Sequence, residues 1–289
     1  MPGVASGDRM DGLERRLDTA LRLAHEAGAL AMRMRPPPGG PQGTLKGVQD
    51  WLTEADGAVE RFLSDHLADA FPEDGFQGEE GGIQRAGLLR WVVDPIDGTA
   101  NFMRGGNRFC ISLGLIEDRT PVLGVIVAPA LNEVFAARQG GGATLNGEPI
   151  KAADTTALTR ATVELGWSSR RPNADFLSMC ARVVGAGAVL RMGGSGALGL
   201  ADVAAGRQDA YGELHINLWD VAAALAILAE AGAAVSPFLD GDGPDRGNPI
   251  LAAAPGVAEA VAQVTGLPGR SDHSAIISFA NASGSVSIG

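Results

Sequence analysis

Apolar residues in the first third of the chain recur every three or four positions. Leucine, alanine and methionine keep this spacing from Leu13 to Met34, which predicts an amphipathic helix. The proline- and glycine-rich run 36–41 cannot continue a helix, so it marks the helix end and a loop. The same spacing predicts a second helix over about 56–70, closed by Phe71 and Pro72.

Shorter apolar runs between turn signals predict strands further along the chain. We expect strands at 88–93, 110–116, 122–127 and 133–137, the last three forming an antiparallel meander. Asn146-Gly147 is typical of a tight hairpin turn. Beyond residue 150 the pattern alternates, with strands predicted at 162–166, 189–192, 210–213 and 250–253, and helices at 174–182, 195–205, 218–230 and 257–265.

These elements predict an α+β fold, a layered αβαβα sandwich. Residues 1–150 are expected to form an N-terminal α+β half with helices and an antiparallel-rich sheet. Residues 151–265 are expected to form a C-terminal α/β half with a mixed sheet and helices. Residues 266–289 are rich in Ser, Gly and Asn, and we expect them to be a flexible tail.

Composition and charge narrow the possible partners. Hydrophobic residues make up 45% and charged residues 20% of the chain, as in ordinary globular proteins. The net charge of -11 disfavours nucleic acid and anionic membrane surfaces as partners. Two cysteines far apart in sequence indicate neither a disulfide framework nor a zinc motif. Charged residues stand where a signal peptide needs an apolar core, so a cytoplasmic location is expected.

The segment Trp91–Thr99 carries the strongest chemical signal. A predicted buried strand leads into Asp94-Pro95-Ile96-Asp97-Gly98-Thr99. Pro95 restricts the residue before it and removes a backbone donor, so the chain is expected to turn there. The carboxylates of Asp94 and Asp97 could then converge with the carbonyl of Ile96, and hard oxygen ligands of this kind suit magnesium. Backbone amides around Gly98 and Thr99 could receive a phosphate oxygen.

Acidic residues that could also bind a metal ion stand in further segments, and each of them has an ordinary structural explanation as well. Glu79 and Glu80 stand in a glycine-rich stretch that could be a solvated loop. Asp56, three residues after Thr53, and Asp220, after Trp219, stand at predicted helix starts and could be capping or first-turn residues.

Together these segments resemble the inositol monophosphatase family over about residues 10–265. The matching pieces are the acid after Leu52-Thr53, Gly-Glu-Glu at 78–80, Asp-Pro-Ile-Asp-Gly-Thr-Ala-Asn-Phe at 94–102, and Trp-Asp at 219–220 before an alanine-rich helix. The resemblance implies hydrolysis of a phosphate monoester by water activated by two or three Mg²⁺ ions, with Mn²⁺ as a possible substitute. It also implies lithium sensitivity and a homodimer.

The resemblance further implies a role for each matching residue. Glu79, Asp94 and the Ile96 carbonyl would hold one ion, and Asp94, Asp97 and Asp220 a second. Most of these ligands lie within 1–150, and Asp220 lies within 151–265. Glu79 and Thr99 would orient or deprotonate the attacking water, and Asp56 would fix the Thr99 hydroxyl. The residues expected on the substrate and phosphate side are Asp97, Gly98, Thr99, Gly194, Ser195, Gly196 and Glu213.

The identity of the ester stays open at this point. Glu213 lies seven residues before Asp220, the family spacing for an acid that accepts hydrogen bonds from substrate hydroxyls, which favours myo-inositol 1-phosphate. A carboxylate would equally suit the ammonium group of histidinol phosphate. Asn217 stands where some members have histidine. A sugar bisphosphatase, a nucleotide 3'-phosphatase and a non-enzymatic protein-binding role in transcription are further alternatives. The small-residue turn at 193–197 could also serve only close helix packing.

Overall fold

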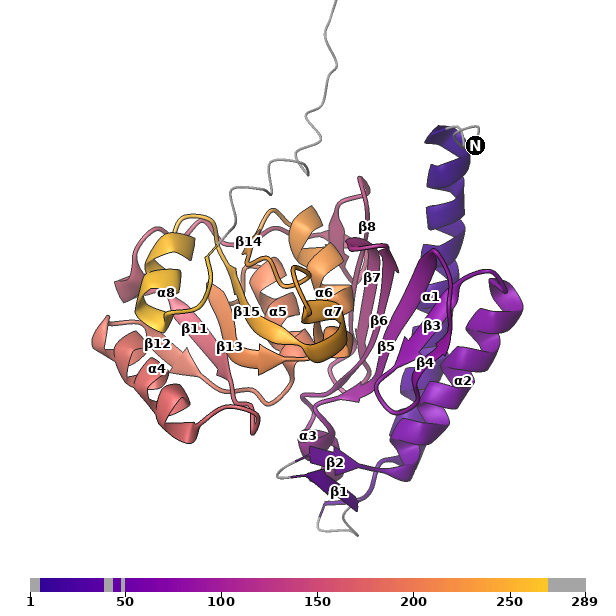
Figure 1. The fold of residues 1–289 in the computed structure, drawn as a ribbon, viewed down its shortest axis with the longest axis horizontal. Helices are drawn as coiled ribbons and strands as arrows, with labels where there is room; N and C mark the ends of the chain where they lie inside the picture. Colours follow the sequence, from indigo (N-terminus) through magenta and orange to yellow (C-terminus); the bar gives the residue numbers. More distant parts are fainter. Residues whose placement is uncertain (1–5, 39–43, 48–49, 270–289) are drawn as a thin grey trace, which may run out of the picture.

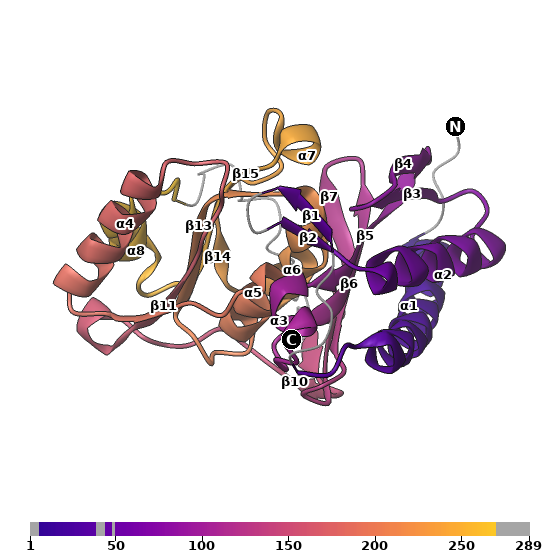
Figure 2. The same ribbon diagram turned by 90° about the horizontal axis from the view of Figure 1, so that it is seen from below.

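The computed structural model describes residues 6–38, 44–47 and 50–269 of the chain. Figure 1 shows layers of helices and sheets that alternate across the molecule, and Figure 2 shows the same layers from below. The predicted αβαβα sandwich is confirmed. The expected flexible tail falls largely on residues 270–289, which lie outside the described residues.

The first two layers are a helix pair and a large sheet. Helices α1 (Ser6–Met34) and α2 (Glu54–Ala70) pack on a sheet with strand order β10-β9-β8-β7-β6-β5-β3-β4. Its pairs are antiparallel except β3 with β5, which is parallel. The strands are β3 (Gly75–Gly78), β4 (Gly82–Arg85), β5 (Leu89–Asp97), β6 (Cys110–Glu117), β7 (Thr120–Ala128), β8 (Glu133–Arg138), β9 (Ala143–Leu145) and β10 (Glu148–Pro149).

Helices α5 (Gly196–Ala204) and α6 (Leu218–Glu230) form the central layer. The second sheet follows, with order β12-β11-β13-β15-β14, and α4 (Asn173–Gly185) and α8 (Ala258–Thr265) cover its far side. Its strands are β11 (Thr162–Gly166), β12 (Val189–Arg191), β13 (Ala210–Ile216), β14 (Ala234–Val235) and β15 (Asn248–Ala253). The remaining elements are β1 (Thr44–Gly47), β2 (Asp50–Leu52), α3 (Thr99–Met103), a 3₁₀ turn (Leu158–Arg160) and α7 (Gly243–Arg246).

The periodic segments fold as their patterns predict. The meander of β6, β7 and β8 is present, and Asn146 and Gly147 join β9 to β10 with positive φ angles of 52° and 84°. The predicted strand at 88–93 differs, because β5 continues to Asp97. The predicted turn at Pro95 is therefore wrong: the chain turns at Gly98, where φ is +90°.

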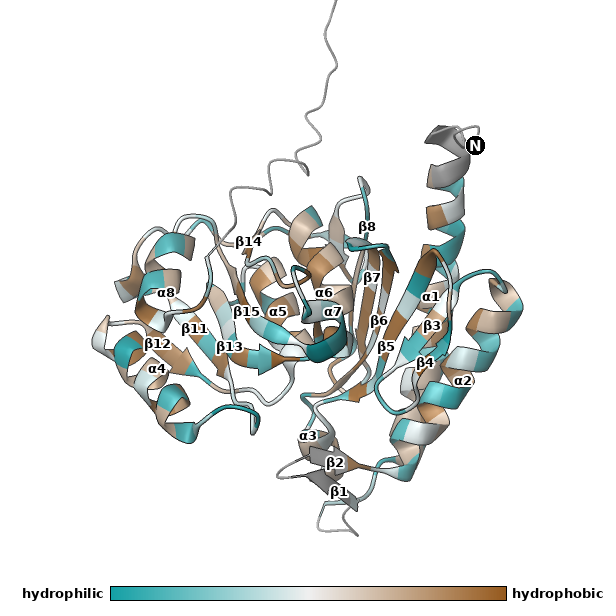
Figure 3. Ribbon diagram, in the orientation of Figure 1, coloured by the Kyte–Doolittle hydropathy of each residue, from teal (hydrophilic) through white to brown (hydrophobic). Residues whose placement is uncertain are grey.

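The apolar residues gather in layers that match the fold. One cluster lies between α1, α2 and the large sheet, a second surrounds α5 and α6, and a third lies under α4 and α8. Figure 3 shows hydrophobic residues along the strands and on α6, with hydrophilic residues on the outward side of α2. No helix within the described ranges combines the length and apolar character that a bilayer crossing requires.

Helix α6 lies directly on the backbone of the large sheet. A Cβ atom added at Gly114 would lie 2.6 Å from the backbone of Ala222, and one at Gly124 would overlap the carbonyl oxygen of Ala223. Glycine on the strands and alanine on the helix therefore let the two backbones approach closely. This contact sets the distance between α6 and the sheet, and therefore the distance of Asp220, in the first turn of α6, from β5 and β6.

Candidate active site

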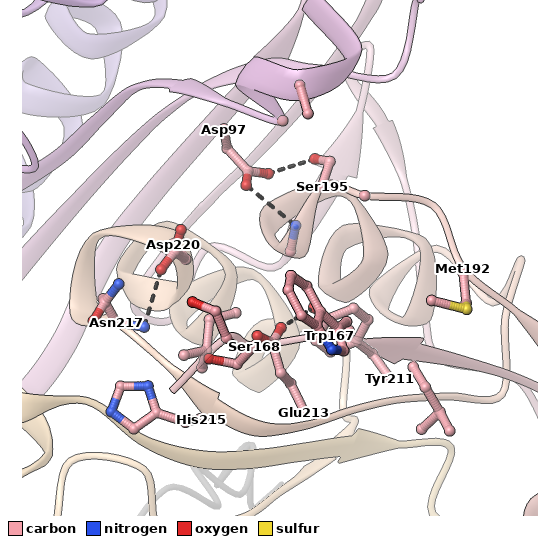
Figure 4. A pocket seen from close by; sticks show the side chains of 18 of the residues that line it. Asp97, Trp167, Ser168, Met192, Ser195, Tyr211, Glu213, His215, Asn217 and Asp220 are labelled. Carbon is pink, nitrogen blue, oxygen red and sulfur yellow. Dashed lines mark hydrogen bonds between the residues drawn. The ribbon is translucent and has the colours of Figure 1, made fainter. Parts of the chain in front are cut away.

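Three acids, two of them buried and one partly buried, meet where the large sheet faces the central helices. Asp94 and Asp97 lie on β5 and Asp220 lies in the first turn of α6, and one carboxylate oxygen from each lies within 4.8 Å of the others. Asp94 is 1% exposed and Asp97 is 6% exposed. Figure 4 shows Asp97 and Asp220 facing the same space from different elements. Three of the four acids that the sequence predicted as metal ligands are thus brought together from distant positions, and Glu79 is not among these three.

A bulge in β5 lets two of these acids share one side of the strand. Residues at i and i+3 of a regular strand point to opposite faces. Here Asp94 pairs with Ser112 and Asp97 pairs with Cys110, so β5 has one residue more than β6 in this interval. Pro95 occupies the interrupted stretch, where its missing N–H breaks no regular ladder bond. The backbone N–H of Ile96 donates to the Asp94 carboxylate at 3.0 Å.

The start of α5 holds Asp97 in place. Its carboxylate accepts hydrogen bonds from the Ser195 hydroxyl, from the Gly196 N–H at 3.2 Å and from the Ala197 N–H at 2.9 Å. Burial raises the pKa of Asp97, and these hydrogen bonds to the charged form oppose that rise. The small-residue turn therefore has a partner within the chain, because its amides at 196 and 197 bind Asp97.

Asp220 and Asp56 are both capping residues of helices. The N–H of Asn217 donates to Asp220 at 3.0 Å, and the N–H of Thr53 donates to Asp56 at 2.7 Å, each in a capping box. The capping interpretation is therefore correct for both acids, and it coexists with their place at the site. Asp56 is fully buried, and burial raises its pKa to about 6.

Thr99 connects Asp56 to the end of β5. Its hydroxyl donates to the Ile96 carbonyl at 2.9 Å and lies 3.5 Å from a carboxylate oxygen of Asp56. The carbonyl predicted as a metal ligand thus faces the Thr99 hydroxyl. The expected contact between Asp56 and Thr99 is present, at the outer limit of hydrogen-bond length.

Glu79 enters the site from the turn between β3 and β4. Its backbone N–H donates to the Val93 carbonyl at 3.1 Å, which places it next to Asp94 along the sheet. The stretch predicted as a loop is thus a hairpin turn, and β3 before it runs parallel to β5. Short glycine-rich strands such as β3 and β4 carry no apolar alternation, so the sequence did not predict them.

The acids raise one another's pKa. Burial raises the pKa of Asp94 well above its ordinary value, and the negative charges of Glu79, Asp97 and Asp220 add to the rise. The pKa of Asp220 is raised well above its ordinary value by burial and then by Asp97 and Glu79. Within the described ranges, neither Asp94, Asp97 nor Asp220 forms an ion pair with lysine or arginine.

This donor set fits a hard divalent cation. Clustered carboxylates with no cationic partner among the described side chains are expensive to keep ionised in a buried place. Carboxylate and carbonyl oxygens are the ligands that magnesium prefers, and soft ligands are absent from the described cluster. The observed arrangement therefore matches the chemistry of a magnesium centre.

A cavity of about 380 Å³ opens beside these acids. Its lining contains the predicted residues Glu79, Asp97, Gly98, Thr99, Gly194, Ser195, Gly196, Glu213 and Asp220. The buried residues Asp94, Ile96 and Asp56 lie behind this lining. The cavity thus joins the acidic cluster to a second polar wall on β13.

Glu213 is the principal polar group of that second wall. It is 8% exposed, and the Tyr211 hydroxyl donates to its carboxylate at 2.6 Å. Burial raises the pKa of Glu213 to about 7, and the Tyr211 hydrogen bond opposes this rise. Figure 4 shows Glu213 across the cavity from Asp97, with Trp167 and Ser168 near it.

The sequence did not single out Tyr211, Met192 or Arg170, which also line the cavity. For Tyr211 a signal existed: residues 211, 213 and 215 alternate along β13, and all of them line the cavity. Met192 and Arg170 lie in loops whose positions no local pattern indicates.

Comparison with known proteins agrees with this geometry. A Xylella fastidiosa protein named Nus factor SuhB is 39% identical over 202 residues, covering 69% of this chain and 73% of that protein. A Rhizobium meliloti inositol-1-monophosphatase is 36% identical over 231 residues, covering 78% of this chain and 87% of that protein. The solved structure of the extragenic suppressor protein SuhB from Bartonella henselae aligns with a TM-score of 0.79 at 29% identity, covering 86% of this chain and 97% of that one. Residues 13–266 match the inositol monophosphatase family, and the chain belongs to that family.

Proposed function

We propose that this chain is a magnesium-dependent phosphatase that converts myo-inositol 1-phosphate to inositol and phosphate. The observation that carries the proposal is the meeting of Asp94, Asp97 and Asp220 beside a cavity with Glu213 on its opposite wall. Family membership supports phosphatase chemistry. In this proposal the acid cluster binds the metal ions on one side of the cavity, and the opposite wall with Glu213 binds the alcohol part of the substrate.

In this proposal Glu79, Asp94 and the Ile96 carbonyl would hold one ion, and Asp94, Asp97 and Asp220 would hold a second. When bound, magnesium supplies positive charge that activates water and neutralises the leaving oxygen. Manganese has the same ligand preferences and could replace it.

The chain's own groups then position the reacting atoms. Glu79 and Thr99 orient the attacking water, and the carboxylate of Glu79 accepts its proton. Asp56 fixes the Thr99 hydroxyl, which lies 3.5 Å away. The amides at Gly98 and Thr99 face the phosphate, and Ser195 keeps Asp97 in place. Positioning and charge stabilisation contribute most of the rate, because phosphoryl transfer has a loose transition state.

Glu213 supports a polyol as the alcohol part of the substrate. A carboxyl group with a pKa of about 7 can both accept and donate hydrogen bonds near neutral pH. Adjacent hydroxyl groups offer both kinds of partner, whereas the ammonium group of histidinol phosphate offers only donors. This difference favours inositol phosphate over histidinol phosphate.

A panel of phosphate esters tests the proposal. Purified protein with magnesium is assayed for phosphate release from myo-inositol 1-phosphate, histidinol phosphate, fructose 1,6-bisphosphate and adenosine 3',5'-bisphosphate. We expect kcat/KM for inositol 1-phosphate to exceed the others at least tenfold, about 1.4 kcal/mol. A higher value for another ester would reassign the substrate, and no release from any ester would reject the phosphatase itself.

A second candidate function is a protein-binding role in transcription. The observation that favours it is the 39% identity to a relative named Nus factor SuhB. Affinity purification of the tagged chain, followed by identification of polymerase-associated proteins, tests this role. The variant Asp94→Asn distinguishes the two functions, because it should lose phosphate release and keep any protein partner.

A further inference from the structure

Glu60 is a buried acid that the proposed chemistry does not use. It lies on α2, one helical turn after Asp56, and is 4% exposed. Its carboxylate accepts the backbone N–H of Glu80 at 2.8 Å, the backbone N–H of Gly81 at 2.8 Å and the side-chain amide of Gln84 at 2.9 Å. All three donors belong to the hairpin formed by β3, β4 and their turn. These three hydrogen bonds thus tie α2 to that hairpin.

The glycines of the hairpin make room for this carboxylate. A Cβ atom at Gly78 would overlap Glu60, and one at Gly81 would overlap the side-chain amide of Gln84 and lie 2.8 Å from a carboxylate oxygen of Glu60. Neither glycine has a positive φ angle, so backbone conformation does not require glycine at these positions. Their small size therefore lets Glu60, and the Gln84 amide that donates to it, approach the turn.

The turn that Glu60 holds is the turn that carries Glu79. On one side, the Glu79 N–H is attached to β5 through the Val93 carbonyl at 3.1 Å. On the other side, the next two amides are attached to Glu60. Figures 1 and 2 show α2 running beside β3 and β4. The backbone at Glu79 is thus fastened from both neighbours, the sheet and the helix.

We propose that Glu60 is a positioning residue that fixes the turn between β3 and β4 and thereby places the Glu79 carboxylate for magnesium binding. The inference rests on the proposed function, in which Glu79 is a ligand. Glu60 itself does not touch the ion in this proposal. Groups that orient metal ligands typically change metal affinity 10–100-fold when they are removed.

The variant Glu60→Gln tests this role, because it keeps the size of the side chain and loses one acceptor oxygen and the charge. Magnesium binding is measured by isothermal titration calorimetry, and the magnesium concentration for half-maximal phosphate release is measured separately. We expect about tenfold weaker binding and a similar rise in the half-maximal concentration. A role in folding alone would lower the melting temperature of the metal-free protein and leave magnesium affinity unchanged.

Glu230→Gln is a matched control. The Glu230 carboxylate accepts the backbone N–H groups of Gly140 and Gly142, both at 2.8 Å, in the turn after β8. The chemistry of two amides on one carboxylate is the same, but this turn carries no group of the acidic cluster. We expect Glu230→Gln to bind magnesium with wild-type affinity.

Gly81→Ala separates position from charge. Its methyl group meets both the Glu60 carboxylate and the Gln84 amide bound to it, so the turn is displaced while no charge changes, and we expect weaker magnesium binding here too. Wild-type affinity in Glu60→Gln, or weak binding in Glu60→Gln with wild-type affinity in Gly81→Ala, would overturn the positioning role. If the wild-type protein neither binds magnesium nor releases phosphate, the proposed function and this inference fall together. That result is distinct, because it appears before any substitution is made.

Discussion

The hydroxyl of Ser195 donates a hydrogen bond to the carboxylate of Asp97 across 98 positions of sequence. Asp97 ends a strand of the large sheet, and Ser195 caps the central helix α5. The bond therefore joins two layers of the fold at the edge of the cavity. It also favours the ionised form of Asp97 and so opposes the rise in pKa that burial causes.

Ser195→Ala should lower kcat/KM for phosphate release about tenfold, because a hydrogen bond to a buried charged group contributes about 1.5–3 kcal/mol. Steady-state kinetics at saturating magnesium measures this effect. Ser236→Ala is the matched control, since the buried Ser236 hydroxyl lies in the second sheet and accepts an uncharged partner, the backbone N–H of Leu251, at 3.0 Å. Equal losses in the two variants would mean that the effect comes from general destabilisation.

Asp94→Asn should reduce phosphate release by several orders of magnitude, because the proposed shared ligand of both ions loses its charge. The same change should leave the metal-free protein at least as stable, since it removes a buried acid whose pKa is raised by burial and by four neighbouring acids. Turnover and thermal unfolding in EDTA measure the two effects. Near-normal turnover at saturating magnesium would remove the two-ion assignment.

Magnesium should raise the melting temperature more at pH 8 than at pH 5. Burial and neighbouring acids raise the pKa values of Asp94 and Asp220, so protons compete with the cation for these carboxylates more strongly at the lower pH. Thermal unfolding with magnesium or EDTA at each pH measures the difference. An equal shift at both pH values would indicate that the ion binds elsewhere, and Asp94→Asn should abolish most of the shift at pH 8.

Lithium should inhibit phosphate release. It is a small cation that takes oxygen ligands, and with a single charge it cannot neutralise the acids and the phosphate as magnesium does. Rates measured over a lithium series at several magnesium concentrations check the expectation, with potassium as the control salt. If lithium and potassium slowed phosphate release equally, the effect would come from ionic strength and not from lithium binding at the site.

Stability of the metal-free protein should fall between about pH 4.5 and pH 7 because of Glu213. Its pKa is about 7 in the folded chain against an ordinary value of 4.5, so in this window the folded chain holds a proton that the unfolded chain has lost. The contribution of Glu213 to the free energy of unfolding is about 3 kcal/mol. It is fully present below pH 4.5 and is lost as the pH rises through 7.

Glu213→Gln should remove this part of the pH dependence, so melting curves of the two proteins from pH 5 to pH 8 provide the test. We expect the wild-type melting temperature to fall relative to the variant by roughly 5 °C. Tyr211→Phe should extend the window upward, because it removes the hydrogen bond that favours the ionised carboxylate. Parallel curves for the wild type and Glu213→Gln would contradict the raised pKa.

Local patterns were sufficient to predict much of this fold. Helical spacing in α1, α2 and α6 and the short apolar strands gave the layers, because burial on one face leaves a repeat in the sequence. The run from Asp94 to Thr99 pointed to two of the three clustered acids, because two carboxylates, a proline and a glycine stand within six residues.

Contacts between distant segments left no comparable signal. The bulge at Pro95 depends on the register between β5 and β6, so the sequence alone suggested a turn there. Glu60 looks like any polar residue of an amphipathic helix, and only the folded chain shows its carboxylate against two amides of a hairpin 20 and 21 residues away. The amides of Gly196 and Ala197 similarly acquired a partner, Asp97, that lies far off in sequence.

The direct packing of α6 on Gly114 and Gly124 sets the distance between the acids of the cluster. The distance between Asp220 and the end of β5 depends on main-chain atoms that are already in contact, so the helix and the sheet cannot move closer together. A single methyl group at Gly124 would widen that gap, whereas changes at the cavity mouth, around Trp167 and Met192, would leave it untouched. Selectivity for the alcohol can therefore diverge at the mouth while the spacing of the acids stays constant.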